Sequence, residues 1–223
     1  MYQIIIDGPS GSGKTSVGKR VADALNVLFF DSDVLKGAIA VACVGSGLNP
    51  TIEEDVKRVI AENKFQFKRG QGEHATMDIL LNGRSVLPQL KSRIIIGASY
   101  SLSKLQIVAK FLNYLQHEFA KTDTLVIEGV NASKNFPHAR FKFFLMADAS
   151  IRAKRELESL NEEGIYSVTY DQILIDVLDS DRSMFVGEAS SMEIAKDAIV
   201  IDTTSNSIAE TAFEIVEIVR KNI

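Results

Sequence analysis

The residues best suited to chemistry lie near the amino terminus, in the stretch DGPSGSGKTS, which follows the apolar run YQIII. Residues 8–15 match the pattern G-x-x-x-x-G-K-[ST] at every defined position. In this pattern glycines let backbone N–H groups approach phosphate oxygens, the lysine neutralises the outer phosphates, and the last hydroxyl binds Mg²⁺. The spacing therefore predicts a loop that binds a nucleoside triphosphate, with Mg²⁺ on Thr15. The residues expected to contact the triphosphate are Gly8, Ser10, Gly11, Ser12, Gly13, Lys14, Thr15 and Ser16.

Acidic residues at the ends of apolar runs form a second group. The run VLFFDSD ends in Asp31, Ser32 and Asp33, and LVIEG carries Glu128 near its end. The carboxyl ends of parallel strands border the ligand crevice of such a sheet. Asp33 is therefore expected to bind Mg²⁺ or to orient an acceptor hydroxyl; the alternative is that Ser32 or Asp33 caps the next helix. Glu128 has the place of a Walker-B acid, for which metal or water positioning and a structural role stay open.

Alternating strands and helices must position these residues. Short apolar runs predict five strands, YQIIID, VLFFDSD, TLVIEG, FKFFLM and DAIVIDT. Helices are expected at 14–25, 34–44, 51–61, 101–119, 150–161, 169–181 and in SIAETAFEIVEIVRK. Thr51 and Glu54 have capping-box spacing, and the last helix should turn Ile208, Ala212, Ile215 and Val219 inward. Five strands with helical crossovers predict an α/β fold, a three-layer αβα arrangement around a parallel sheet.

The middle of the chain departs from this alternation. The runs FQFKRG and TMDILLNGRSV alternate apolar and polar residues, and Asn82-Gly83 is a strong signal for a tight turn. This pattern predicts a small antiparallel unit inserted into the βα pattern.

Composition limits the class of protein. The 223 residues are 46% hydrophobic and fit one domain with an inserted lobe. The net charge of −4 argues against a general nucleic-acid binder, and no apolar run approaches the length of a membrane span. The single cysteine excludes intramolecular disulfides, and no amino-terminal signal is visible. We expect a cytoplasmic monomer that binds small-molecule nucleotides, and neither nucleic acid nor membranes.

The stretch IDGPSGSGKTSVGKRVADAL, followed by FFDSD, resembles the start of a bacterial cytidylate (CMP/dCMP) kinase. The hairpin-rich insert is similar to the extra sheet lobe of these enzymes, and IYSVTYDQILIDVLDSDR resembles their lid and the helix after it. The resemblance implies a P-loop nucleoside monophosphate kinase that uses ATP and Mg²⁺ to phosphorylate CMP or dCMP. It divides one kinase domain, residues 1–223, into a core (1–62, 90–150 and 190–223), an acceptor-binding insert (about 63–90) and a helical lid (about 151–189).

The resemblance also assigns single residues. Arg152 and Arg155 match lid residues that contact ATP or the transferring phosphoryl group, so the catalytic set expected is Lys14, Asp33, Arg152 and Arg155. Thr15 and Asp33 are the expected metal-binding residues. The expected acceptor-binding residues are Ser32, Lys36, Arg93, Ser99, Ser101 and Arg182.

Several arginines of the family's acceptor site are missing. The arginine expected five residues after Ser32 is Gly37, and the family's DGRD is replaced by EGVN at 128–131. Of the lid-side charges expected over 180–187, Asp181 and Arg182 keep theirs. An arginine–phosphate fork makes two charge-assisted hydrogen bonds, so its loss must change the site.

Three interpretations stay open. The first is a cytidylate-kinase-like enzyme. The second is a kinase of another small hydroxyl compound, because the opening also resembles shikimate kinase, with Asp33 near the acceptor hydroxyl. The third is a nucleotide-binding protein that has lost kinase activity.

Overall fold

The computed structural model describes residues 1–69, 77–162, 164–185 and 192–223. They form two units. The loop unit consists of Tyr2–Leu25 and Val126–Ile223, and the middle unit consists of Met1 and Asn26–Leu125. Parts of the predicted insert (70–76) and of the predicted lid (163 and 186–189) lie outside the described residues.

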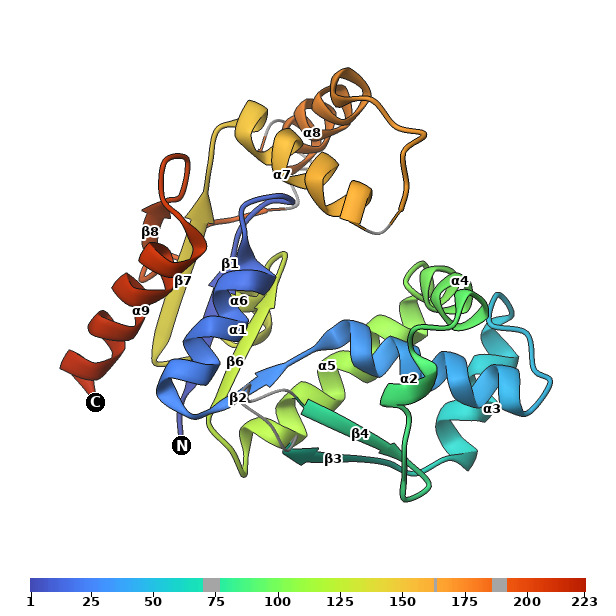
Figure 1. Cartoon of the computed structure of the whole chain (residues 1–223). Helices are drawn as coiled ribbons and strands as arrows, with labels where there is room; N and C mark the ends of the chain where they lie inside the picture. The colour runs from blue at the N-terminus through green and yellow to red at the C-terminus, as the bar shows by residue number, and fades with distance from the viewer. Residues whose placement is uncertain (70–76, 163, 186–191) are drawn as a thin grey trace. The chain divides into compact units, whose positions relative to one another are not determined.

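A five-stranded sheet has the strand order β2-β6-β1-β7-β8 (Figure 1). Register is defined along β7, where Ile4 lies opposite Phe141 and Phe143 lies opposite Ile199, both in parallel pairs. The central residues Ile4, Ile5 and Ile6 are fully buried, as expected for a parallel sheet with helices on both faces. The predicted parallel sheet is confirmed. Its strands are β1 (Gln3–Asp7), β2 (Leu28–Phe30), β6 (Leu125–Gly129), β7 (Phe141–Met146) and β8 (Ile199–Asp202).

The loop unit also contains five helices among its described residues. They are α1 (Lys14–Leu25), α6 (Ala132–Asn135), α7 (Ala149–Glu162), α8 (Tyr170–Phe185) and α9 (Ile208–Asn222). Helix α9 packs against α1 and begins at a capping box in which Ser207 and Glu210 exchange hydrogen bonds. Ala212, Ile215 and Val219 are buried as predicted. The inward placement of Ile208 was wrong, because this first residue of the helix is 42% exposed.

Helices α7 and α8 pack against each other around a small core of their own (Figure 1). Ala153 of α7 and Ile173 and Val177 of α8 are its buried members. This helical pair confirms the helices predicted for 150–161 and 169–181.

The middle unit contains the predicted antiparallel sheet, in the order β3-β4-β5. Its described elements are α2 (Ser32–Gly45), α3 (Glu53–Glu62), β3 (Phe65–Arg69), β4 (Met77–Leu81), β5 (Arg84–Ser85), the 3₁₀ turn η1 (Leu87–Gln89), α4 (Arg93–Leu102) and α5 (Gln106–Ala120). Asn82 and Gly83 join β4 to β5 with positive φ values of 51° and 83°. Two positive φ values are what a two-residue hairpin turn requires, so the tight turn is confirmed.

Three phenylalanines hold the small sheet to its unit. The ring centroids of Phe67 in β3 and Phe119 in α5 are 4.0 Å apart in an edge-to-face arrangement. Phe30 of β2 lies 6.1 Å from Phe67 and 6.3 Å from Phe119. These contacts therefore join β2, β3 and α5 around one aromatic cluster.

Two local predictions were wrong. The range 101–119, predicted as a single helix, spans the end of α4 and most of α5, because α4 ends at Leu102. Its C-cap is Ser103, whose hydroxyl donates to the Tyr100 carbonyl at 2.7 Å. Thr51 and Glu54 form no capping box: α3 begins after Ile52 without a side-chain cap, and the Thr51 hydroxyl donates to Asn49 Oδ1 at 2.8 Å. In both cases a serine or threonine hydroxyl bonds a nearby group in its own turn, which competes with helix formation.

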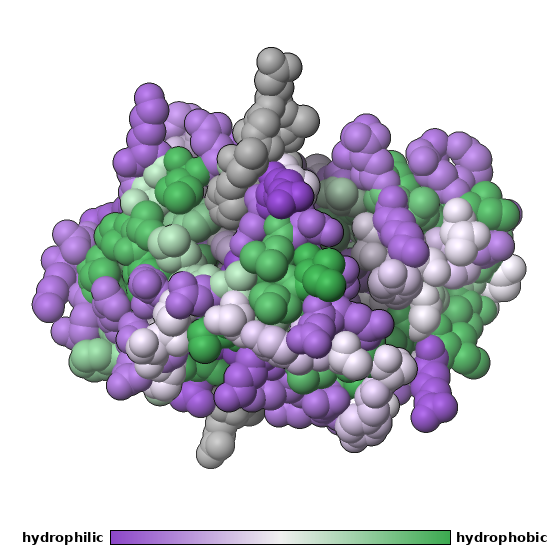
Figure 2. All heavy atoms as spheres, turned by 90° about the horizontal axis from the view of Figure 1, so that it is seen from above, coloured by the Kyte–Doolittle hydropathy of each residue, from purple (hydrophilic) through white to green (hydrophobic). Residues whose placement is uncertain are grey.

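The surface mixes polar and apolar residues. Figure 2 shows hydrophobic side chains lying among hydrophilic ones on one face, and exposed large side chains include Ile94, Tyr100 and Phe213. Such exposure is ordinary for a folded protein. None of the helices in the described ranges combines the length and apolar character needed to cross a membrane.

A buried lysine of β7 binds the segment that leads into β8, through Asp197. Lys142 of β7 has a side chain only 4% exposed, and its Nζ donates to Asp197 Oδ2 and to the Pro137 carbonyl, each at 2.6 Å. The hydrogen bond from Lys142 lowers the pKa of Asp197 below its usual value. A carboxyl whose pKa is lower in the folded state stabilises the protein above its unfolded pKa. That stabilisation is lost as the pH falls through the folded pKa.

Replacing Asp197 with Asn should lower the free energy of unfolding by about 1–2 kcal/mol at pH 7, because Lys142 loses its anionic partner. Between about pH 5 and pH 3 the difference from wild type should shrink. Denaturant unfolding at several pH values measures both effects. The control is Glu62→Gln, which breaks an exposed pair with Arg58 and should cost little. Equal stabilities for Asp197→Asn and wild type at pH 7 would contradict the assignment.

Candidate functional site

The glycine loop, residues 8–13, connects β1 to α1, which confirms the predicted strand–loop–helix arrangement. Gly8, Gly11 and Gly13 have positive φ values of 150°, 72° and 92°. A Cβ atom on Gly8 would lie 2.2 Å from the Leu145 carbonyl oxygen, and one on Gly11 would lie 2.7 Å from the Arg152 carbonyl oxygen. Side chains at these positions are therefore excluded by backbone conformation and by contact with β7 and α7.

Lys14 places its ammonium group within the glycine loop. Its Nζ donates to the Pro9 carbonyl at 2.8 Å, and the Ser12 hydroxyl donates to the same oxygen at 2.9 Å. Burial lowers the pKa of Lys14, while the negative charges of Glu128 and Asp7 raise it and the positive charge of Arg152 lowers it. A buried ammonium in this condition is stabilised by any further anion that binds beside it.

Asp7 is a site residue that the sequence reasoning missed. It is 3% exposed, and its two carboxylate oxygens accept from Ala132 N at 2.6 Å and from Ser133 N at 2.9 Å. These bonds attach the start of α6 to the end of β1. The available signal was an acidic residue at the end of an otherwise apolar strand, directly before the glycines.

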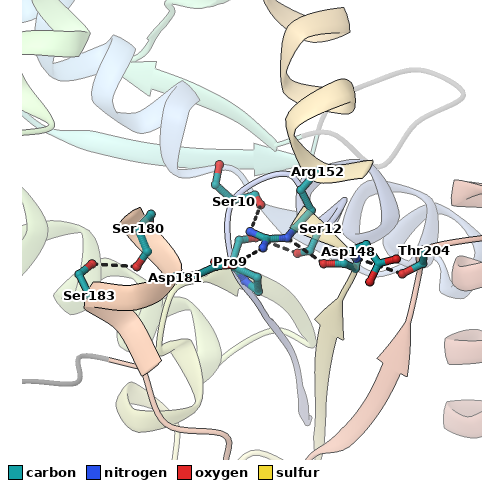
Figure 3. Close-up of polar contacts among 10 residues, drawn as sticks. Pro9, Ser10, Ser12, Asp148, Arg152, Ser180, Asp181, Ser183 and Thr204 are labelled. Carbon is teal, nitrogen blue, oxygen red and sulfur yellow. Dashed lines mark hydrogen bonds and ion pairs between the residues drawn. The ribbon is translucent and has the colours of Figure 1, made fainter. Parts of the chain in front are cut away.

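Arg152 lies against the outside of the glycine loop (Figure 3). Its side chain is 4% exposed. Nε donates to the Ala147 carbonyl at 2.9 Å, Nη1 donates to the Ser10 carbonyl at 3.3 Å, and Nη2 forms an ion pair with Asp181 of α8. The guanidinium therefore joins α7, α8 and the loop.

Arg155 is directed toward the turn between β8 and α9. Its Nη1 donates to Thr203 Oγ1 at 3.1 Å, and its Nη2 donates to the Thr203 carbonyl at 2.6 Å. Thr203 Oγ1 also lies 3.2 Å from the carbonyl oxygens of Ser12 and Met146. Thr203, which the sequence reasoning also missed, thus links Arg155 to the floor of the loop.

The remaining hydroxyls of the loop region differ in exposure. Ser12 is fully buried, whereas Thr15 and Ser16 are exposed in the first turn of α1. The Ser10 hydroxyl donates to Glu156 of α7 at 3.3 Å.

The acidic end of β2 belongs to the middle unit. Asp31 is the N-cap of α2, because its Oδ1 accepts from Asp33 N at 3.0 Å and from Val34 N at 3.2 Å. The alternative that Ser32 or Asp33 caps this helix was therefore wrong. Asp33 is 80% exposed and pairs with Lys36 at 2.6 Å.

The other acceptor residues predicted from the sequence lie on two helices. Arg93, Ser99 and Ser101 are in α4, where the Ser101 hydroxyl donates to the Gly97 carbonyl at 3.2 Å. Arg182 is exposed in α8 of the loop unit.

Two positions where this chain departs from the family's acceptor site, Gly37 in place of an arginine and Asn131 in place of an aspartate, have their own structural surroundings. Gly37 is buried in α2, and a Cβ atom there would lie 2.5 Å from Leu90 Cδ2. Leu90 therefore fills the space beside the position where the resemblance expects an arginine. Asn131 has a positive φ of 62°, and its Oδ1 accepts from Glu193 N at 3.2 Å. Within the described ranges, no group of three or more His, Cys, Asp or Glu residues could hold a metal ion.

Replacing Gly11 with Ala should destabilise the protein by more than the ~1–2 kcal/mol of a left-handed alanine, because the new methyl group also meets the Arg152 backbone. It should weaken ATP binding in the presence of Mg²⁺ by about tenfold or more. Gly47→Ala is the matched control: its φ is 66°, but nothing lies within 4 Å of the added atom. Thermal unfolding and calorimetric titration measure the two effects. Wild-type ATP affinity in Gly11→Ala would contradict the role given to the close contact.

Comparison with known proteins identifies the family. A model of the family described as cytidylate kinase matches residues 4–221. The chain is 32% identical to a cytidylate kinase of Thermosipho melanesiensis, over 98% of this chain and 97% of the relative, and 30% identical to one of Thermosipho africanus, over 97% and 94%. Among solved structures, shikimate kinase from Acinetobacter baumannii aligns with a TM-score of 0.47 at 14% identity, covering 100% of this chain and 94% of that one. The match to nearly the whole chain shows that this protein belongs to the cytidylate kinase family.

Proposed function

We propose that this protein transfers the terminal phosphoryl group of ATP to a nucleoside monophosphate, with CMP or dCMP as the acceptor. The observation that carries the proposal is the partly buried ammonium of Lys14, which donates to the Pro9 carbonyl inside a complete glycine loop. Membership of the cytidylate kinase family over nearly the whole chain supports the choice of acceptor.

The donor half of the site fits a triphosphate with its metal. Gly8 and Gly11 carry no side chain at the two positions where a Cβ atom would meet neighbouring backbone, and Lys14 supplies a positive charge. Thr15 is exposed in the first turn of α1 and is proposed to bind Mg²⁺. The metal-binding role of Asp33, at the end of β2, stays a proposal from the sequence. When bound, Mg²⁺ would neutralise charge on the phosphates.

Lys14 has the central role in this proposal. Phosphoryl transfer depends mainly on positioning and on neutralising charge around the transferring group. An incoming phosphate would take Lys14 Nζ from the Pro9 carbonyl and replace a neutral partner with an anionic one. The charge would then stabilise the outer phosphates as the bond to the leaving group breaks.

Arg152 and Arg155 are proposed to act through the loop. Their guanidinium groups already donate to backbone carbonyls of the loop and of the turn after β8, and Arg152 also pairs with Asp181. We therefore assign them to the support of the donor site.

The acceptor half is assigned to Ser32, Lys36, Arg93, Ser99, Ser101 and Arg182. Lys36 is the clearest candidate for the acceptor phosphate, because its side chain is 22% exposed and its partner Asp33 is largely exposed. A dianionic phosphate would compete with Asp33 for this ammonium.

A second candidate function is nucleotide binding without phosphoryl transfer. It is favoured by Leu90, which fills the space beside Gly37, and by Asn131, which bonds the backbone of Glu193. Leu90 occupies the space beside one position where the resemblance expects an arginine, and Asn131 stands where the family has an aspartate. A monomeric state and a cytoplasmic location stay predictions.

ADP formation should be measured with ATP and Mg²⁺ across CMP, dCMP, UMP, AMP and shikimate. CMP or dCMP should be turned over fastest. Lys14→Ala should lower that rate by about 100-fold or more, because the phosphate charge is left unmet. A rate close to wild type in Lys14→Ala would refute the assignment of the site.

The matched control is Lys121→Ala, which removes an exposed lysine paired with Glu118 and should keep the wild-type rate. Tight ATP binding without turnover of any acceptor would support the second candidate function instead.

A further inference from the structure

A second positively charged group is buried close to Lys14. Arg152 is 4% exposed, and its charge acts on Lys14 strongly enough to contribute to the lowered pKa of that lysine. A buried guanidinium is stable only where an anion and hydrogen-bond acceptors surround it. The anion paired with it is Asp181, in the carboxyl-terminal half of α8, whose side chain is 26% exposed.

The contacts of Arg152 fix two consecutive residues of the glycine loop. Nη1 donates to the Ser10 carbonyl at 3.3 Å. The backbone of Arg152 lies so close to Gly11 that a Cβ atom there would meet the Arg152 Cβ at 2.8 Å. The tip of the loop therefore meets Arg152 twice, through the guanidinium at Ser10 and through the backbone at Gly11.

Asp181 in turn holds the guanidinium. Its Oδ2 pairs with Arg152 Nη2, as Figure 3 shows beside Pro9 and Ser10. Its Oδ1 is buried and has no hydrogen-bond partner among the residues that the structure describes. The favourable contacts of this carboxylate are thus concentrated on Arg152. A buried polar atom left unpaired is unusual enough to require an explanation.

We propose that Asp181 is a positioning residue for the donor phosphates: it holds Arg152 against Ser10 and Gly11, and so fixes the tip of the phosphate loop from α8. This role rests on the proposed function. Without the carboxylate, the Arg152 charge near Lys14 would lack its counter-ion and the guanidinium would leave the Ser10 carbonyl. Donor affinity and the packing of α8 on the loop are coupled by this chain of contacts.

The test is a mutant cycle measured with the full-length protein. Asp181→Asn, Arg152→Met and the double variant are compared for ATP affinity by calorimetry and for the KM values of ATP and CMP. Asp181→Asn should raise the Kd and KM of ATP about tenfold while changing the KM of CMP less than about twofold. Asp181→Glu should restore ATP affinity to within about threefold of wild type, and the double variant should bind ATP no more weakly than Arg152→Met.

A matched control separates positioning from stability. Asp197→Asn also removes the anionic partner of a buried cation in the loop unit, Lys142. The ammonium of Lys142, however, donates to Asp197 and to the Pro137 carbonyl, which lie outside the glycine loop. This variant should lower the melting temperature and keep wild-type ATP affinity. If Asp181→Asn also keeps wild-type ATP affinity, or if the KM values of ATP and CMP rise together, the positioning role is refuted.

The same data distinguish the inference from the proposed function. Loss of ATP affinity in Asp181→Asn, in a protein that turns over no acceptor, would support the inference and refute the kinase. Turnover of CMP by the wild type, together with unchanged ATP affinity in Asp181→Asn, would support the kinase and refute the positioning role of Asp181. A wild-type protein that fails to bind ATP would overturn both.

Discussion

The partial burial of the Lys14 ammonium is the constraint on which the phosphate loop and its neighbours depend. A charge removed from water must be met by carbonyls, by opposite charges or by a ligand. The loop supplies the Pro9 carbonyl, and Asp7 and Glu128 supply negative charge at the ends of two neighbouring strands. An anion bound beside Lys14 would add a further opposite charge to these groups.

The loop that holds Lys14 also lies in close contact with the backbone of β7 and α7. Gly8 lies against the Leu145 carbonyl of β7, and Gly11 lies against Arg152 of α7. Through these contacts, the conformation of the loop depends on segments more than a hundred residues away in the sequence. Asp7 accepts from the start of α6, and Arg152 donates to the Ser10 carbonyl and pairs with Asp181 of α8. Thr203 of the β8–α9 turn lies within hydrogen-bond distance of the Ser12 carbonyl. The donor site is thus a product of the whole loop unit.

Sequence reasoning predicted the loop, α1 and the hairpin turn because the information for them is local. The order of glycines, Lys14 and Thr15 defines a strand–loop–helix, and Asn82-Gly83 defines its turn. It missed Asp7 and Thr203, whose roles come from partners 125 and 191 residues away in the chain. The break at Ser103 was missed because the apolar spacing of 101–119 continues through it.

The acceptor side shows a different limit. Leu90 beside Gly37 and the bond from Glu193 to Asn131 are tertiary features that no residue spacing predicts. They show what surrounds Gly37, where the family has an arginine, and Asn131, where it has an aspartate. The acceptor itself must be identified by assay.

The central claim is that the terminal phosphoryl group moves from ATP to a monophosphate. Its most direct test is to incubate the protein with γ-³²P-labelled ATP, Mg²⁺ and CMP and to separate the products. The account predicts label in the β-phosphate of CDP. Label found in inorganic phosphate alone, or left entirely in ATP, would contradict it.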